Sequence, residues 1–166
     1  MKQKVQLAIA IGVLLLRIES LSAAEFQPLG KAVGSALGAT VGVQKSTVIV
    51  DGKPQAYFFT KDAAGKPQQL AFVQKRIYPP NCTHTWVVGV GAKSKKIEKI
   101  EVVEMSCSHA FPTKTESFLS QFMGKGPLEA KTLEGSVNTV AKATGTSNLA
   151  ASAVVASIRA AVEIGK

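Results

Sequence analysis

A hydroxyl-rich stretch near the carboxyl end of the chain has the residue types of a phosphate site. It runs from Asn138 to Ser147, with the sequence N-T-V-A-K-A-T-G-T-S, and a long apolar segment rich in alanine follows it. A short turn that leads into a helix leaves the first backbone N–H groups of that helix without partners inside it and points its positive end outward. Such a turn suits a phosphate, but Ser and Thr at a helix start also serve as ordinary N-caps. The residues themselves leave both interpretations open.

The two cysteines each lie two residues before a histidine, as Cys82 with His84 and Cys107 with His109. In an exported protein an even cysteine count favours a disulfide, which here would join residues 25 positions apart and stabilise the fold by about 3 kcal/mol. Two free thiols are one alternative to this preferred interpretation. A zinc site built from all four side chains is another, although the spacing is unusual for structural zinc.

The amino-terminal residues have the order of a secretory signal peptide. A short basic start, Met1–Lys4, precedes the apolar run Val5–Leu16, and small residues lead to Ala24. This order predicts cleavage after Ala24, with residues 25–166 forming a single domain in the periplasm or outside the cell. An uncleaved membrane anchor or a buried helix is the alternative, but the run is shorter than the ~20 residues that a membrane span needs.

The mature chain remains basic. Removing residues 1–24 takes away three basic residues and one acidic residue, which lowers the formal net charge from +9 to +7. The lysines are scattered along residues 45–131 without interleaved aromatic side chains, a pattern typical of a solvated surface rather than a nucleic-acid groove. We therefore expect no nucleic-acid partner and some attraction for anionic partners or cofactors. About 140 residues suffice for one domain with a real core but are short for two.

Hairpins of β-strands are predicted for the earlier part of the mature chain. The dipeptide Asp51-Gly52 between two apolar runs is typical of a type I′ hairpin turn. Tyr78-Pro79-Pro80-Asn81 is predicted to be a loop, because two prolines remove backbone donors. Alternation in the last strand places Ile100, Val102 and Met105 toward the core. The expected strands are residues 47–50, 56–60, 70–73, 85–91 and 99–105.

Helices are predicted on both sides of these strands. Residues 28–38 have helical spacing weakened by glycines, which indicates a marginal helix or a docking arm. After Thr113 the apolar period becomes helical, with Thr113 or Thr115 as the cap, Phe118, Leu119 and Phe122 on one face, and Gly124 as the stop. Residues 126–135 are expected to be irregular and residues 148–164 to form a buried helix. Hairpins followed by helices predict an α+β fold, in which an antiparallel sheet packs against C-terminal helices.

Three blocks between residues 55 and 162 form a family pattern. The first is W-V-V-G-V at residues 86–90 with K-I-E-K-I-E-V-V-E at residues 96–104, a strand–turn–strand unit. The second is S-H-A-F-P-T at residues 108–113 with S-F-L-S-Q-F-M-G-K at residues 117–125, similar to S-H-x-E-T-P and F-L-x-Q-F-x-G-K. The third is residues 138–147, which align with D-x-x-[S/T]-G-A-T-x-T-S. Together they resemble the FMN-binding domain family, whose members include the flavin-carrying C subunit of the sodium-pumping NADH:quinone reductase and the related periplasmic subunit of Rnf-type complexes.

This resemblance implies an FMN phosphate site in the third block. In many members a flavin transferase joins FMN through a phosphoester bond to a threonine that corresponds to Thr144, and Thr146 and Ser147 would add hydroxyl donors. A threonine just before a helix start agrees with this role, since backbone N–H groups and the helix dipole would hold the phosphate. The cofactor-binding residues that the resemblance implies are Thr144, Thr146, Ser147, Lys142, Ala143, Gly145, His109, Phe111 and Thr113.

Four positions depart from the family pattern. Asn138 replaces Asp, Ala141 replaces Ser or Thr, and Lys142 replaces Gly. Lys142 adds positive charge beside the phosphate, while its side chain crowds a turn that glycine makes easily. Phe111 replaces Glu, and an aromatic ring there can stack on the flavin or simply pack before Pro112. These departures leave the covalent link to Thr144 open.

The leading hypothesis is an exported, flavin-based electron carrier. No Ser-His-Asp or Cys-His arrangement is evident in the sequence, which favours a carrier over a substrate-converting enzyme. The resemblance implies FMN, a flavin transferase, a redox partner protein and docking to a membrane complex as partners. A flavin-free structural or partner-binding subunit of an exported redox complex is the alternative. A third hypothesis is a metal-binding domain that uses both cysteines and both histidines.

Overall fold

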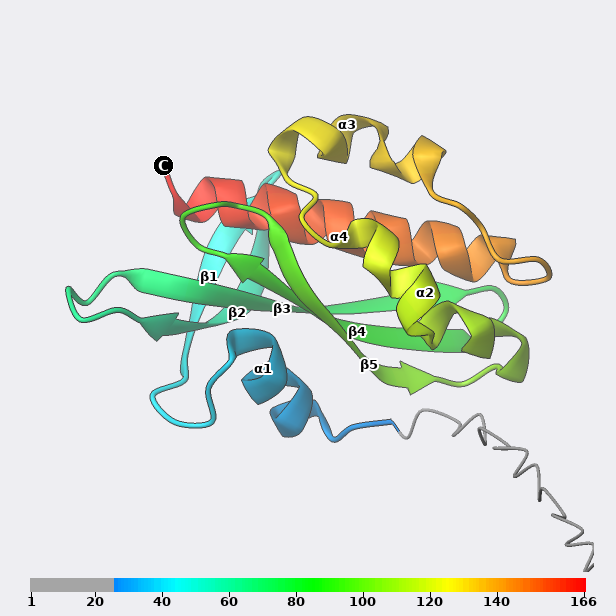
Figure 1. The fold of residues 1–166 in the computed structure, drawn as a ribbon, viewed down its shortest axis with the longest axis horizontal. Coiled ribbons are helices and arrows are strands. Elements are labelled where there is room, and N and C mark those ends of the chain that lie inside the picture. Colours follow the sequence, from blue (N-terminus) through cyan, green and yellow to red (C-terminus); the bar gives the residue numbers. More distant parts are fainter. Residues whose placement is uncertain (1–25) are drawn as a thin grey trace, which may run out of the picture.

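Five antiparallel strands in chain order form the central sheet of the computed structural model, which describes residues 26–166. The predicted signal peptide, residues 1–24, lies outside the described residues. Each strand pairs with the next along the chain, so the sheet is a simple meander (Figure 1). The strands are β1 (Gln44–Val50), β2 (Lys53–Lys61), β3 (Pro67–Tyr78), β4 (Cys82–Gly91) and β5 (Ile97–Met105).

Helices cover both faces of this sheet. The long helix α4 lies along one face and contacts β1, β3 and β4, while α3 packs on the outer side of α4 (Figure 1). The short helix α1 lies on the opposite face, against β3, β4 and β5. The helical segments are α1 (Leu29–Leu37), η1 (Ser108–Lys114), α2 (Glu116–Leu119), η2 (Ser120–Phe122), α3 (Pro127–Ser136) and α4 (Thr144–Ile164), where η marks a 3₁₀ helix.

The predicted α+β fold with an antiparallel sheet is confirmed, and its hairpins follow from local turn chemistry. Asp51 and Gly52 both have positive φ, 49° and 74°, as a type I′ turn requires. The turn at residues 92–96 joins β4 to β5. Residues 79–81 form the tight turn between β3 and β4 that the two prolines predicted.

A β-bulge in β5 explains why Ile100, Val102 and Met105 share a face although their spacing is not strictly alternating. Thr85 pairs with Glu104 but Trp86 pairs with Val102, so Val103 is an extra residue. Val103 packs with the cluster under α1, whereas Ile100 and Met105 are buried in the larger cluster under α4. The predicted core positions in this strand are therefore confirmed.

Helix α1 is an integral part of the fold rather than a docking arm. Its Ala32, Val33, Ala36 and Leu37 are buried against the sheet. The contact is close because β4 has a glycine beneath it: a Cβ placed on Gly89 would come within 2.6 Å of the Ala36 carbonyl oxygen. This second apolar layer goes beyond the predicted packing against C-terminal helices.

The buried C-terminal helix is confirmed, but it begins earlier than predicted. It starts at Thr144 rather than near Asn148, because the Ser147 N–H already donates to the Ala143 carbonyl at 2.9 Å. Within residues 26–166, α4 is the one helix whose length and composition would suit a membrane span, and more than half of its apolar window is buried inside the protein. Its alanine-rich composition thus fits a helix enclosed between the sheet and α3.

Two other helix predictions need correction. Residues 126–135 are not irregular: Pro127 occupies the first turn of α3, and the Glu129 carboxylate accepts the Gly126 N–H at 3.0 Å. The segment after Thr113 is helical but divided into α2 and η2, and Thr113 itself lies inside the preceding 3₁₀ helix η1 rather than at a helix cap. The Thr115 hydroxyl donates to the Pro112 carbonyl at 2.9 Å and does not cap a helix N–H.

Candidate functional site

The stretch Asn138–Ser147 comprises the loop that precedes α4 and the first turn of that helix. Lys142 has a φ of 65°, the left-handed conformation that glycine adopts most easily, and it stands where the FMN-binding pattern has glycine. Ala143 is the N-cap, and Thr144 is the first residue of α4. Lys142 and Thr144 are both exposed. The hydroxyl-rich residues therefore form the first turn of the helix and not a turn that precedes it.

The buried side chain of Ser147 holds this turn in place through two hydrogen bonds. The side chain is fully buried, its hydroxyl donates to the Ala143 carbonyl at 3.0 Å, and the same oxygen accepts the Val140 N–H at 3.1 Å. Both bonds hold the loop of residues 140–143 against the helix. Ser147 positions the turn and does not face outward as the expected hydroxyl donor to a phosphate.

Thr146 points inward as well, toward His84 on β4. The Thr146 Oγ1 and the His84 Nε2 are 3.1 Å apart, and the His84 Nδ1 is 3.0 Å from the Cys82 carbonyl oxygen. Because a carbonyl only accepts, Nδ1 carries the hydrogen and the Thr146 hydroxyl donates to Nε2 of the neutral ring. Burial lowers the pKa of His84, which the Cys82 hydrogen bond partly opposes. The ring also stacks on Trp86, with centroids 5.5 Å apart.

Thr144 and Gly145 form the outward side of the first turn. By helix geometry the N–H groups of residues 144–146 precede the first intrahelical bond and have no acceptor within α4. Gly145 lies close to the Tyr78 ring, which a Cβ at this position would overlap. An anion at this end of α4 would meet the helix dipole, the Thr144 hydroxyl and the Lys142 ammonium group.

The first half of the second sequence block, residues 108–113, lies in η1, and its three predicted site residues have different surroundings. Thr113 is fully buried, and its hydroxyl donates to the Ala110 carbonyl at 2.7 Å. Phe111 is half-buried and already packs edge-on against Phe26, with centroids 5.8 Å apart, while the Lys114 Nζ lies 4.5 Å from the Phe111 centroid. His109 is exposed. Of these three, His109 is the one whose side chain faces a reactive group.

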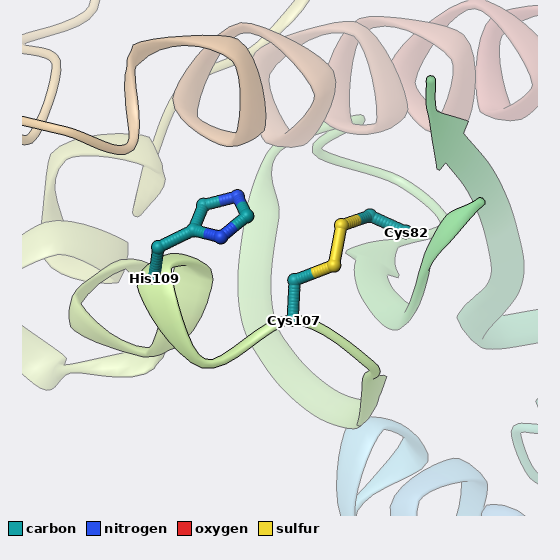
Figure 2. A group of neighbouring side chains, drawn as sticks. All are labelled: Cys82, Cys107 and His109. Atoms are coloured by element: carbon teal, nitrogen blue, oxygen red, sulfur yellow. A yellow bond between two sulfur atoms is a disulfide. The ribbon is translucent and has the colours of Figure 1, made fainter. Parts of the chain in front are cut away.

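That reactive group is the disulfide between Cys82 and Cys107, whose Cα atoms are 5.6 Å apart. The bond joins the start of β4 to the segment after β5. Of the three interpretations of the cysteines, the structure has the preferred one, a disulfide. His109 lies beside it (Figure 2). The four-residue zinc site is not assembled, because both nitrogens of His84 are engaged elsewhere.

A surface depression of about 350 Å³ lies next to the third sequence block. Gln121 joins its two walls: its Oε1 accepts the Asn138 N–H at 2.9 Å, and its Nε2 donates to the Phe118 carbonyl at 2.9 Å. None of the nine predicted cofactor residues lines the depression. Sequence reasoning missed it as a site, although Gln121 and Asn138 belong to the matched blocks. Its lining is Pro112, Thr115, Ser117, Phe118, Gln121, Asn138 and Val140.

The structure thus brings Lys142, Ala143, Thr144 and Gly145 together at one helix end and assigns Thr113, Thr146 and Ser147 to internal hydrogen bonds. No protein-family model matches the chain, and no curated protein or solved structure is significantly similar to it. The resemblance to the FMN-binding domain family therefore depends on the three sequence blocks alone.

Proposed function

We propose that this chain is an exported FMN-binding protein that carries electrons, with the FMN phosphate at the amino end of α4. The observation that carries the proposal is the exposed Thr144 at the first position of this 21-residue helix, two residues after the exposed Lys142. Backbone N–H groups, the helix dipole and one ammonium group all favour a phosphate there. A phosphoester on the Thr144 hydroxyl would leave its remaining oxygens beside these donors.

The buried hydroxyls support the proposal in a different role from the one that the sequence suggested. Ser147 holds the loop of residues 140–143, and Thr146 ties the first turn of α4 to His84. A phosphate seat works best when its donors are fixed before the anion arrives. We therefore assign Thr146 and Ser147 to positioning and Lys142, Thr144 and the backbone of Gly145 to phosphate contact.

The depression beside Asn138 and Val140 is the candidate seat for the rest of the flavin. Phe118, Val140 and Pro112 supply apolar lining, and Gln121 and Asn138 supply polar groups for the ring edge. The bound flavin would supply the redox chemistry, while the protein would hold the phosphate and pack the ring. Phe111 is less suited to stacking than its position in the sequence implied, because Phe26 and Lys114 already contact its ring.

A flavin-free structural subunit of an exported redox complex is the second candidate. It is favoured by the complete internal use of Thr113, Thr146 and Ser147, since the fold satisfies these hydroxyls without any ligand. This candidate predicts that neither flavin binding nor a flavin adduct occurs.

Co-expression with a flavin transferase distinguishes the two candidates. The flavin absorption of the purified protein is recorded, and the protein is then denatured and its intact mass measured. The comparison covers the wild type, Thr144→Ala and Thr139→Ala, which removes an exposed threonine from the loop before α4. We expect one flavin adduct in the wild type and in Thr139→Ala, and none in Thr144→Ala. An adduct that persists in Thr144→Ala contradicts the assignment, and a wild type that carries no flavin in either bound or covalent form favours the structural subunit.

A further inference from the structure

A second candidate site lies around the Cys82–Cys107 disulfide and needs no flavin. The sulfur atoms of Cys82 and Cys107 and a ring nitrogen of His109 all lie within 4.8 Å of one another. In Figure 2 the side chains of Cys107 and His109 leave the same turn on the same side, and the Cys82 sulfur meets them from the start of β4. Two sulfurs and an imidazole nitrogen are a ligand set typical of zinc once the sulfurs are thiolates.

We propose that reduction of this disulfide creates a zinc site with Cys82, Cys107 and His109 as its three protein ligands. A dithiol reductant supplies two electrons and two protons: the Cys82–Cys107 bond breaks, two thiols form, and the dithiol becomes a disulfide. Zn²⁺ then displaces the two thiol protons into solvent, and the neutral His109 imidazole adds its lone pair. Two thiolates balance the charge of the ion, and a water molecule completes the tetrahedron.

The backbone around the cysteines is held together without the disulfide. The Ser106 N–H donates to the Thr83 carbonyl at 3.0 Å, and the Thr83 N–H donates to the Ser106 Oγ at 2.7 Å. These bonds extend the β4–β5 ladder, in which His84 pairs with Met105, to the residues next to both cysteines. The two cysteine Cα atoms are therefore kept close after the sulfurs separate, so the reduced site is largely formed in advance.

The dimensions of a zinc centre fit this framework. With Zn–S bonds of about 2.3 Å and tetrahedral angles, two thiolate sulfurs lie about 3.8 Å apart, which rotation about the two cysteine side chains supplies from a Cα separation of 5.6 Å. The Ala110 N–H donates to the Cys107 carbonyl at 3.0 Å, which fixes the first turn of η1 and so keeps His109 beside the sulfurs.

The three side chains of the site differ in exposure, so an ion can enter from the side of His109. Cys82 is 5% exposed, Cys107 is half-buried and His109 is exposed. His84 is not a ligand in this arrangement, because its two nitrogens face the Cys82 carbonyl and Thr146. The site therefore has three protein ligands and an open fourth position toward solvent, the arrangement of a zinc ion that still binds an external ligand.

Zinc uptake by the reduced protein tests the proposal. The purified protein is reduced with a phosphine, which with one water molecule becomes a phosphine oxide as the disulfide becomes two thiols, and is then dialysed against zinc and analysed for bound metal. We expect one zinc per chain in the reduced wild type and none in the oxidised wild type. The reduced wild type with cobalt(II) in place of zinc should show thiolate-to-metal charge-transfer absorption and the visible bands of a tetrahedral ion.

Single variants identify the ligands. In the reduced state Cys107→Ser and His109→Asn should each weaken zinc binding by at least about 100-fold, because each removes one of three protein ligands. Ser108→Ala, which changes the exposed residue between them, should bind zinc like the wild type. The proposal is overturned if the reduced wild type takes up no stoichiometric zinc, or if His109→Asn binds it as tightly as Ser108→Ala.

Discussion

The Thr146 hydroxyl and the His84 imidazole are 3.1 Å apart in the core, although the two residues are 62 positions apart in the chain. This bond joins the first turn of α4 to His84, the third residue of β4. His84 in turn donates to the carbonyl of Cys82, so the same chain of contacts reaches the disulfide. The amino end of α4, where we propose that a phosphate binds, is thereby fixed to the sheet.

Replacing Thr146 with valine should destabilise the protein. The change keeps the shape of the side chain but leaves the buried His84 Nε2 without a donor, which costs about 1–3 kcal/mol in the free energy of unfolding. Denaturant unfolding measures the loss. Thr146→Ser keeps the hydroxyl and should retain most of the stability, and Thr139→Val, at an exposed position, should change it by less than about 0.5 kcal/mol. Equal stability of the valine and serine variants would show that the bond to His84 contributes little.

The contact between α1 and β4 predicts a contrast between two glycines. In Gly89→Ala the new methyl group would meet the Ala36 carbonyl oxygen at 2.6 Å, inside a packed layer that has little room to move. We expect a loss of about 1–3 kcal/mol in unfolding free energy. Gly30 lies in α1 with open space around it, so Gly30→Ala should leave the free energy of unfolding within about 1 kcal/mol of the wild-type value. If Gly89→Ala unfolds at the wild-type denaturant concentration, α1 does not pack on β4 as described.

Glu129 predicts a pH dependence for the start of α3. The Gly126 N–H, which donates to its carboxylate, lowers the pKa of Glu129 below the usual value. A lowered folded-state pKa adds stability that is complete above the pKa of the unfolded chain, about 4.3, and disappears as pH falls through the lower folded value. The stability difference between the wild type and Glu129→Gln should therefore shrink from neutral pH to below pH 4.

Glu134→Gln provides the control for this titration, because Glu134 lies exposed on the same helix and takes no part in the Gly126–Glu129 hydrogen bond. Its stability difference from the wild type should stay small at each pH. A gap between the wild type and Glu129→Gln that is independent of pH would mean that the carboxylate charge does not contribute to the cap.

Elements whose geometry depends on residues adjacent in the sequence were predictable from the sequence. The type I′ turn at Asp51-Gly52, the turn at the two prolines and the buried helix at the carboxyl end all follow from local residue types. Helix α3 was missed because it buries only Ala130 and Leu133, follows Gly126 and contains Gly135 in its last turn. The signal that identifies it is Pro127 in the first turn followed by Glu129, a pattern typical of a helix start.

The place of the hydroxyl-rich stretch at the start of a helix was predictable from the sequence, but the direction of its side chains was not. The hydroxyl-rich stretch and the amino end of α4 coincide, as the motif indicated. Whether Thr146 and Ser147 face solvent depends on packing against His84 and on the path of residues 140–143, which no local pattern specifies. A hydroxyl in the first turn of a helix is equally suited to a ligand and to an internal bond, so only the tertiary structure distinguishes the two.

The central claim is that this protein holds FMN through its phosphate at the amino end of α4, and a parallel titration with FMN and riboflavin tests it most directly. The two flavins share the ring system and differ in the phosphate, and flavin fluorescence reports binding of both. We predict that FMN binds at least about 10-fold more tightly than riboflavin, and that Lys142→Ala reduces this preference because it removes a charge beside the phosphate. Equal affinity for the two flavins, or no quenching of FMN fluorescence at micromolar protein, would contradict the account.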